Sequence, residues 1–243
     1  MLEIRKNETR YHKQLDWLES YHSMSFGDYY DQDNRFFGPL CVFNEDVIAG
    51  GRGFGAHPHR EMEIITIVLS GQLKHEDSTG QTAVTTFGGV QRMSAGTGII
   101  HSEVNPTEDP AHILQIWITP QTKRLEPSYE TSYYDTERLR GNWLPVVSGQ
   151  SQGEGIAHIH QDTTLYMSEL GAGQGLMYES AGGRLQYLFV IHGEASLTID
   201  GTEHLLARGD TVRLREEKAL EVRGMNSGAL MLLIDLPREG GGA

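Results

Sequence analysis

Two segments of this sequence decide the expected fold and chemistry: Gly53-Phe54-Gly55-Ala56-His57-Pro58-His59-Arg60-Glu61-Met62-Glu63 and Met93-Ser94-Ala95-Gly96-Thr97-Gly98-Ile99-Ile100-His101-Ser102-Glu103-Val104-Asn105. Because successive side chains of a strand point to opposite faces, His57 and His59 share one face, and His101 and Glu103 share one face of another strand. Three imidazoles and one carboxylate suit a divalent first-row transition metal, and four ligands leave one or two positions open for chemistry. The pattern therefore indicates a reactive metal site.

The residues between and around these segments predict strands. Ile64 to Leu69 is rich in β-branched residues, and it is followed by Leu73 to His75 and a turn at residues 77–80. Ile113 to Thr119 predicts a further strand closed by Pro120. Apolar alternation at Leu40 and Val42 predicts a strand that ends in an Asn-Glu-Asp turn at residues 44–46. A sheet can therefore bring the two pairs of ligands together.

Two further features compete with this interpretation. Glu63 lies four residues after His59, on the same side of an extended strand, so spacing alone cannot separate it from Glu103 as the carboxylate ligand. Its natural alternative role is a hydrogen bond to a metal-bound imidazole. His158 and His160 form another His-x-His pair, but no second pair follows at a matching interval. We expect that pair to serve in packing or hydrogen bonding.

Glycine and proline indicate local irregularity around the first histidine pair. The run from Gly50 to Gly55 lacks the Lys-Ser/Thr of a phosphate-binding loop and favours a bend with close backbone approach. Pro58 removes a backbone donor between the two histidines, which predicts an edge strand or an irregular one.

Composition sets outer limits on function. The chain has 243 residues, 38% of them hydrophobic, and a formal charge of −13, which fits a globular protein and disfavours direct binding to nucleic acid. The charged amino terminus does not resemble a signal peptide, and no apolar stretch approaches the length of a membrane span, so a cytoplasmic location is expected. The single cysteine, Cys41, predicts a buried apolar side chain and no intramolecular disulfide.

The two halves of the chain repeat one another. Val68-Leu69-Ser70-Gly71 matches Val190-Ile191-His192-Gly193, and the turn at Gly80 matches Asp200-Gly201. The positions that correspond to the first histidine pair hold Glu179 and Ala181, and no histidine follows His204. We expect domains at residues 1–135 and 136–243, joined by a turn-rich connection from residue 121 to about 154, with metal ligands only in the first.

These segments resemble the pirin family of bicupins. The resemblance rests on the His57-Pro58-His59 and His101-Ser102-Glu103 segments, on residues 93–98, and on supporting motifs at residues 26–31, 114–117, 125–129 and 160–162. It implies an all-β fold of two tandem jelly-roll β-barrels with few short helices. It also implies that His57, His59, His101 and Glu103 bind the metal in the amino-terminal barrel, and that Glu63 is left beside the site.

The resemblance implies two alternative functions. Bacterial relatives are similar to quercetin 2,3-dioxygenases, which use a divalent metal and O₂ to open the heterocycle of a flavonol and release CO; Glu103 would then be both ligand and base. Iron(II) is the expected metal, with nickel, manganese, cobalt or copper as alternatives and zinc acquired on purification. The competing hypothesis is a regulatory metal protein that acts through contacts with a protein partner. A monomer is the simplest expectation.

Overall fold

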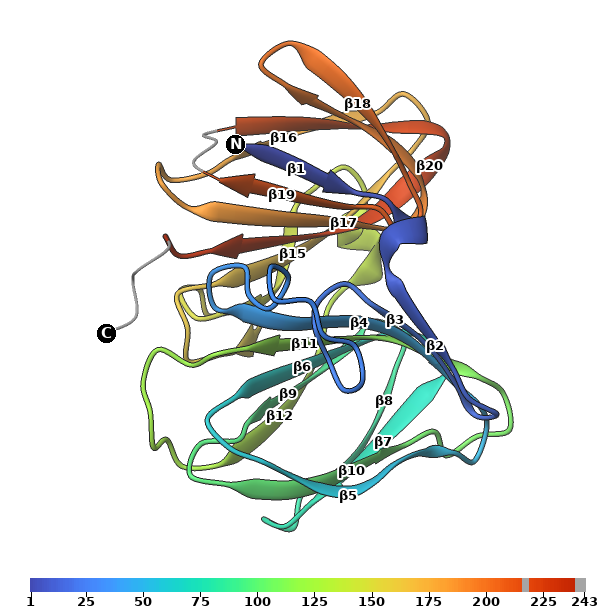
Figure 1. Cartoon of the computed structure of the whole chain (residues 1–243), viewed down its shortest axis with the longest axis vertical. Helices are drawn as coiled ribbons and strands as arrows, with labels where there is room; N and C mark the ends of the chain where they lie inside the picture. Colours follow the sequence, from blue (N-terminus) through green and yellow to red (C-terminus); the bar gives the residue numbers. More distant parts are fainter. Residues whose placement is uncertain (216–218, 239–243) are drawn as a thin grey trace. The chain divides into compact units, whose positions relative to one another are not determined.

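The computed structural model describes residues 1–215 and 219–238, which are mostly β-strand (Figure 1). Helix within the described residues consists of two 3₁₀ turns, η1 (Asn7–Thr9) and η2 (Thr136–Leu139). Neither of these helices could cross a membrane. The predicted all-β class with few short helices is therefore confirmed.

The chain forms two compact units, each assembled from separate segments. The N-terminal unit contains residues 11–134 and 151–161, and the C-terminal unit contains residues 1–10, 135–150 and those from 162 onward. The chain passes from one unit to the other between Tyr134 and Asp135, beside the expected boundary. However, residues 1–10 belong to the C-terminal unit and residues 151–161 belong to the N-terminal unit. The continuous domains 1–135 and 136–243 remain a prediction.

The N-terminal unit consists of two antiparallel sheets and a short further strand. Its strands are β2 (Tyr11–Gln14), β3 (Leu18–His22), β4 (Leu40–Ile48), β5 (Gly53–His59), β6 (Glu63–Ser70), β7 (Gln72–Asp77), β8 (Thr82–Thr86), β9 (Gly89–Ser94), β10 (Ile99–Val104), β11 (Ala111–Ile118), β12 (Ser128–Tyr133) and β14 (Ala157–His158). The larger sheet has the order β12-β9-β6-β11-β4-β3-β2, and the smaller has the order β5-β10-β7-β8. The strand-turn-strand pattern predicted at residues 64–80 is confirmed.

The face of the larger sheet that looks toward β10 is organised in rows of paired residues. One row is polar and crosses all seven strands; its members are Tyr11, His22, Asn44, Gln115, Thr66, Gln91 and Thr131. The adjacent row is apolar; its members are Val42, Trp117, Ile64, Met93 and Tyr129. We call the first the polar row. It places a continuous line of hydrogen-bonding side chains inside the unit.

Strand β4 continues through residues 44–46, so the turn predicted there was wrong. Two of the three polar side chains that suggested a turn have partners on neighbouring strands instead. Asp46 accepts a hydrogen bond from the Ser20 hydroxyl, and the Glu45 carboxylate lies 2.9 Å from Nε2 of His112. A strand interior can hold such residues because the cost of burying a polar group falls when it is hydrogen-bonded.

The C-terminal unit also consists of antiparallel strands. These are β1 (Leu2–Arg5), β13 (Leu144–Ser148), β15 (Thr164–Leu170), β16 (Gly175–Glu179), β17 (Leu185–Ile199), β18 (Thr202–Ala207), β19 (Thr211–Arg215) and β20 (Ala219–Leu236). They follow the order β1-β19-β17-β20-β15-β13, with β16 paired to β20 and β18 paired to β17. Strands β12 and β13 and the η2 turn lie within residues 121–154, and the rest of this predicted turn-rich connection is outside helix and strand.

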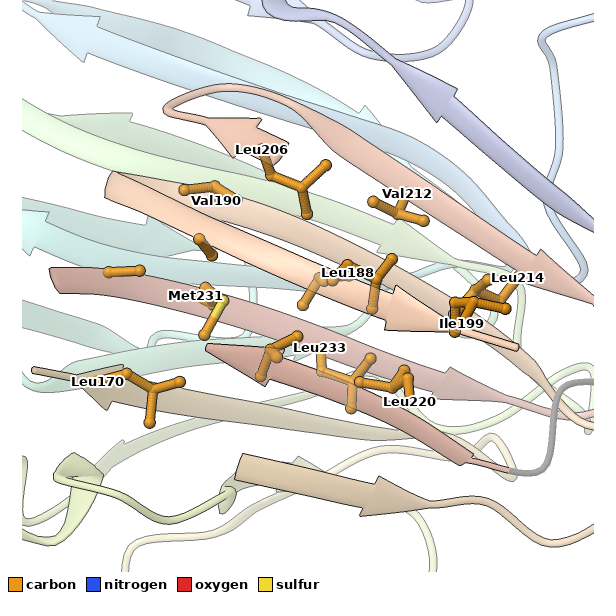
Figure 2. Packing of buried hydrophobic residues seen from close by; sticks show 14 residues of the cluster. Leu170, Leu188, Val190, Ile199, Leu206, Val212, Leu214, Leu220, Met231 and Leu233 are labelled. Carbon is orange, nitrogen blue, oxygen red and sulfur yellow. The ribbon is translucent and has the colours of Figure 1, made fainter. Parts of the chain in front are cut away.

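Hydrocarbon side chains fill the core of the C-terminal unit (Figure 2). Leu188 and Val190 of β17 and Met231 and Leu233 of β20 are fully buried there. The positions that correspond to the first histidine pair lie elsewhere, since Glu179 and Ala181 are exposed. This core packs apolar groups where the N-terminal unit places polar ones.

Two glycines support the predicted duplication. Gly71 and Gly193 have φ angles of +74° and +75°, a conformation that L side chains rarely adopt. A Cβ atom at Gly71 would lie 2.7 Å from Cα of Ala111, and one at Gly193 would lie 3.3 Å from Cα of Ala229. Each glycine thus turns the chain against an alanine of a neighbouring strand within its own unit.

Candidate metal centre

Strands β5 and β10 are antiparallel partners, and their register places His101 opposite His57. A bulge follows, so that Glu103 is opposite Phe54 and these residues face the same side as the histidines. A Cβ atom at Gly53 would lie 2.2 Å from the carbonyl oxygen of Glu103, which explains the glycine. Strand β5 is at the edge of its sheet and is bulged, as Pro58 predicted.

Three of the predicted ligands come together. One ligand nitrogen from each of His57, His59 and His101 can be chosen so that all lie within 4.8 Å of one another. The ring centroids are 4.5 Å apart for His57 and His101, and 4.9 Å apart for His59 and His101. Within the described residues, His57, His59 and His101 form the one group of at least three side chains that could hold a metal ion together.

The hydrogen bonds of the histidines fit a bound metal. Nδ1 of His57 lies 2.7 Å from the carbonyl oxygen of Gly55, so this nitrogen donates and Nε2 carries the lone pair. Nε2 of His59 and Nε2 of His101 are buried without a hydrogen-bond partner. Buried polar atoms are rarely left unpaired, and a divalent cation would satisfy these nitrogens.

His59 and His101 are neutral at physiological pH. Burial lowers the pKa of His59 to about 4, with a smaller contribution from the neighbouring charge of His57. The pKa of His101 is lowered to about 3, mainly by burial and to a smaller extent by the charges of His57 and His59. Neutral imidazole is the form that binds metals, so the site is electrostatically prepared for a cation.

Glu103 lies outside this group of three. Its carboxylate is buried and accepts hydrogen bonds from Thr66 Oγ1 at 3.1 Å and from Gln115 Nε2 at 2.7 Å, one on each oxygen. Both donors belong to the polar row. Burial raises the pKa of Glu103 despite these two bonds, which by themselves favour the ionised form. Its role as fourth ligand remains a prediction.

Glu63 has a different environment from the one predicted. Its carboxylate accepts hydrogen bonds from Ser94 Oγ at 2.8 Å and from the backbone N–H of His160 at 3.3 Å. Side chains alternate along β6, so Glu63 is on the opposite face from Thr66 and from Glu103. Glu63 thus joins β6, β9 and the segment that contains His160, whose expected hydrogen-bonding role is confirmed.

Sequence reasoning missed a fourth histidine, His75 of β7. It is buried, with Nδ1 3.4 Å from Nδ1 of His101, and its Nε2 lies 3.0 Å from the carboxylate of Asp77. Its ring stacks on Tyr129 with centroids 4.0 Å apart. The available signal was the His75-x-Asp77 spacing, which places both side chains on one face of the strand that pairs with β10. If His101 binds a metal, the contact with His75, itself held by Asp77, would orient the His101 ring.

A tryptophan closes the other side of the cluster. The Trp117 ring meets that of His59 edge-on, with centroids 4.8 Å apart. Trp117 belongs to the apolar row, as does Tyr129 beside His75. The histidines therefore lie against the apolar row, and Glu103 reaches the polar one.

Comparison with known proteins agrees with this geometry. Residues 4–118 match the family model for pirin, and residues 146–236 match that for the quercetinase C-terminal cupin domain. The chain is 38% identical to quercetin 2,3-dioxygenase of Escherichia coli over 98% of this chain and 99% of that protein. It is 36% identical to a putative quercetin 2,3-dioxygenase of Pseudomonas aeruginosa, over 96% and 99%.

Solved structures agree as well. The bacterial pirin YhhW of E. coli in complex with nickel(II) is 35% identical, with a TM-score of 0.89 over 98% of this chain and 100% of that one. The structure of YhhW determined separately gives a TM-score of 0.90. These matches confirm the predicted bicupin fold. The chain belongs to the pirin family.

Proposed function

We propose that the protein is a metal-dependent dioxygenase that opens the heterocycle of a flavonol such as quercetin with O₂ and releases CO. The observation that carries this proposal is the group of three imidazoles, two of which have buried, unpartnered Nε2 atoms. The curated relatives at 36–38% identity are named for the same reaction, which supports the assignment.

The chain would hold a divalent transition metal through His57, His59 and His101, with Glu103 as the fourth ligand. We propose iron(II); nickel is supported as an alternative by the nickel complex of the E. coli pirin. A bound metal of this class supplies Lewis acidity and open positions at which a substrate oxygen and O₂ can meet.

The chain's own contribution is to orient and deprotonate the substrate. Glu103 would accept the proton of the flavonol 3-hydroxyl, because Thr66 and Gln115 leave lone pairs on both of its oxygens. Those two donors also fix the carboxylate in one orientation. Trp117 and the stack of Tyr129 on His75 surround the cluster with apolar surface, which limits the access of water.

Oxygen uptake tests this proposal. Iron-reconstituted protein is given quercetin in an oxygen-electrode cell, with metal-free protein and His101→Ala as blanks, because quercetin also oxidises slowly by itself. His192→Ala, which changes an exposed histidine of the C-terminal unit, is the matched control. We expect uptake and CO release from the wild type and His192→Ala alone. Absence of uptake by protein with one bound iron would favour the regulatory hypothesis.

A further inference from the structure

The N-terminal unit contains a cavity of about 240 Å³ between β3, β4, β11 and β5. Its walls are partly aromatic, formed by Trp17, Phe26 and Phe54. Trp17 and Phe54 meet edge to face, with ring centroids 5.3 Å apart. The remaining wall includes Asn44 and Gln115, neighbours in the polar row. The cavity thus combines flat apolar surfaces with a line of amide groups.

Two residues that line this cavity are also neighbours of Glu103. The Gln115 side chain that lines it also donates the 2.7 Å hydrogen bond to Glu103. Phe54 lines it too, and Phe54 is the residue of β5 opposite Glu103. The side chains of Gln115 and Phe54 therefore lie between a molecule in the cavity and Glu103.

Asn44 has a hydrogen-bonding capacity that its surroundings do not use. The residue is 1% exposed, and its side-chain oxygen Oδ1 has no hydrogen-bond partner. An unpaired buried acceptor costs free energy, and a ligand that brings a donor removes that cost. The neighbour of Asn44 in the row, Gln115, donates its amide N–H to Glu103. Oδ1 of Asn44 is therefore a buried acceptor that a ligand hydroxyl can satisfy.

We propose that this cavity holds the hydroxylated phenyl ring of the substrate, and that Asn44 Oδ1 accepts a hydrogen bond from a phenolic hydroxyl. The volume of 240 Å³ is below the roughly 300–1,000 Å³ of sites that enclose a whole drug-sized ligand, so it suits one ring rather than the entire molecule. In a flavonol, the catechol ring is attached to the carbon next to the 3-hydroxyl. A 3-hydroxyl at Glu103 would thus direct that ring toward the cavity. The inference rests on the proposed function for the choice of ligand.

A binding measurement without O₂ tests the cavity independently of turnover. Iron-loaded protein is titrated anaerobically with quercetin and with galangin, the flavonol that lacks both catechol hydroxyls. We expect the wild type to bind quercetin about tenfold more tightly than galangin, which is the effect of one hydrogen bond. Asn44→Leu should abolish this difference and leave the galangin affinity unchanged. Trp17→Ala should weaken both ligands several-fold.

Tyr30→Ala is the matched control, because Tyr30 is an exposed aromatic residue of the same unit that does not line the cavity. It should leave both affinities unchanged. Equal binding of the two flavonols by the wild type would overturn the assignment, and this comparison needs no variant to fold. A preference for quercetin that survives in Asn44→Leu, or weaker binding in Tyr30→Ala but not in Trp17→Ala, would do the same. Because the titrations contain no O₂, they measure binding alone. If the oxygen-uptake experiment showed no dioxygenase activity, these binding results would still test the cavity.

Discussion

The hydrogen bond between Thr66 and Glu103 links the larger sheet to the proposed fourth ligand, and Thr66→Val removes it without changing the shape of the side chain. Thr66 is 1% exposed, so water cannot replace the hydroxyl. The carboxylate would keep Gln115 as the partner of its other oxygen. The variant therefore isolates the contribution of a single donor to a buried carboxylate.

The expected magnitude follows from this geometry. A hydrogen bond to a charged group contributes about 1.5–3 kcal/mol to the free energy of unfolding. The methyl group that replaces the hydroxyl offsets about 0.8 kcal/mol of this loss through apolar burial. The net destabilisation is about 1–2 kcal/mol, which lowers the melting temperature by about 2–8 °C for a protein of this size.

Thermal unfolding of metal-free protein at pH 8, followed by circular dichroism, measures this effect. The matched control is Thr82→Val, the same substitution at an exposed position of β8, where we expect a change within about 0.5 kcal/mol. If Thr66→Val melted at the same temperature as Thr82→Val, the reasoning would be refuted. Glu103 would then not depend on the polar row for its position.

Three further predictions concern other parts of the N-terminal unit. His75→Phe keeps a ring against Tyr129 but removes the partner of His101, so nickel affinity should fall about 10–100-fold in a chelator competition. Burial raises the pKa of Glu63, so wild-type stability should fall as the pH rises above 4.5, the ordinary pKa of a glutamate. Glu63→Gln has no carboxyl group to ionise and lacks this loss. The melting temperature of Glu63→Gln relative to that of the wild type should therefore increase from pH 5 to pH 8. Burial raises the pKa of Cys41 to about 12, so its thiol should react with a disulfide reagent much faster in denaturant than in the native protein.

The sequence predicted individual strands because those signals were local, whereas the two-barrel architecture was predicted from the resemblance to the pirin family. Alternation and β-branched runs located β6 and β11, and Pro58 correctly indicated an irregular edge strand. The Asn-Glu-Asp segment of β4 misled because turn propensity is local, whereas Asp46 and Glu45 find partners on neighbouring strands. Tertiary pairing overrode the local preference.

The candidate site was predictable where one strand carried the whole signal. The His57-x-His59 spacing is such a signal, and the structure brings both residues to His101. His75 could not be found in this way, because its relation to His101 depends on the register of β7 with β10. The same is true of Glu63, whose parity matched that of His59 but whose strand begins after a bend with positive φ at Glu61. Parity cannot be counted through such a residue.

The position of Pro58 also bears on association between molecules. An edge strand exposes backbone groups to which a strand of another molecule can add, and such addition is a common route to aggregation. Pro58 lies in the edge strand β5 between two histidines of the cluster, and it has no N–H to offer. Pro58 thereby discourages a neighbouring chain from extending the sheet across the histidines. Self-assembly through this edge is disfavoured at the place where it would obstruct the cluster.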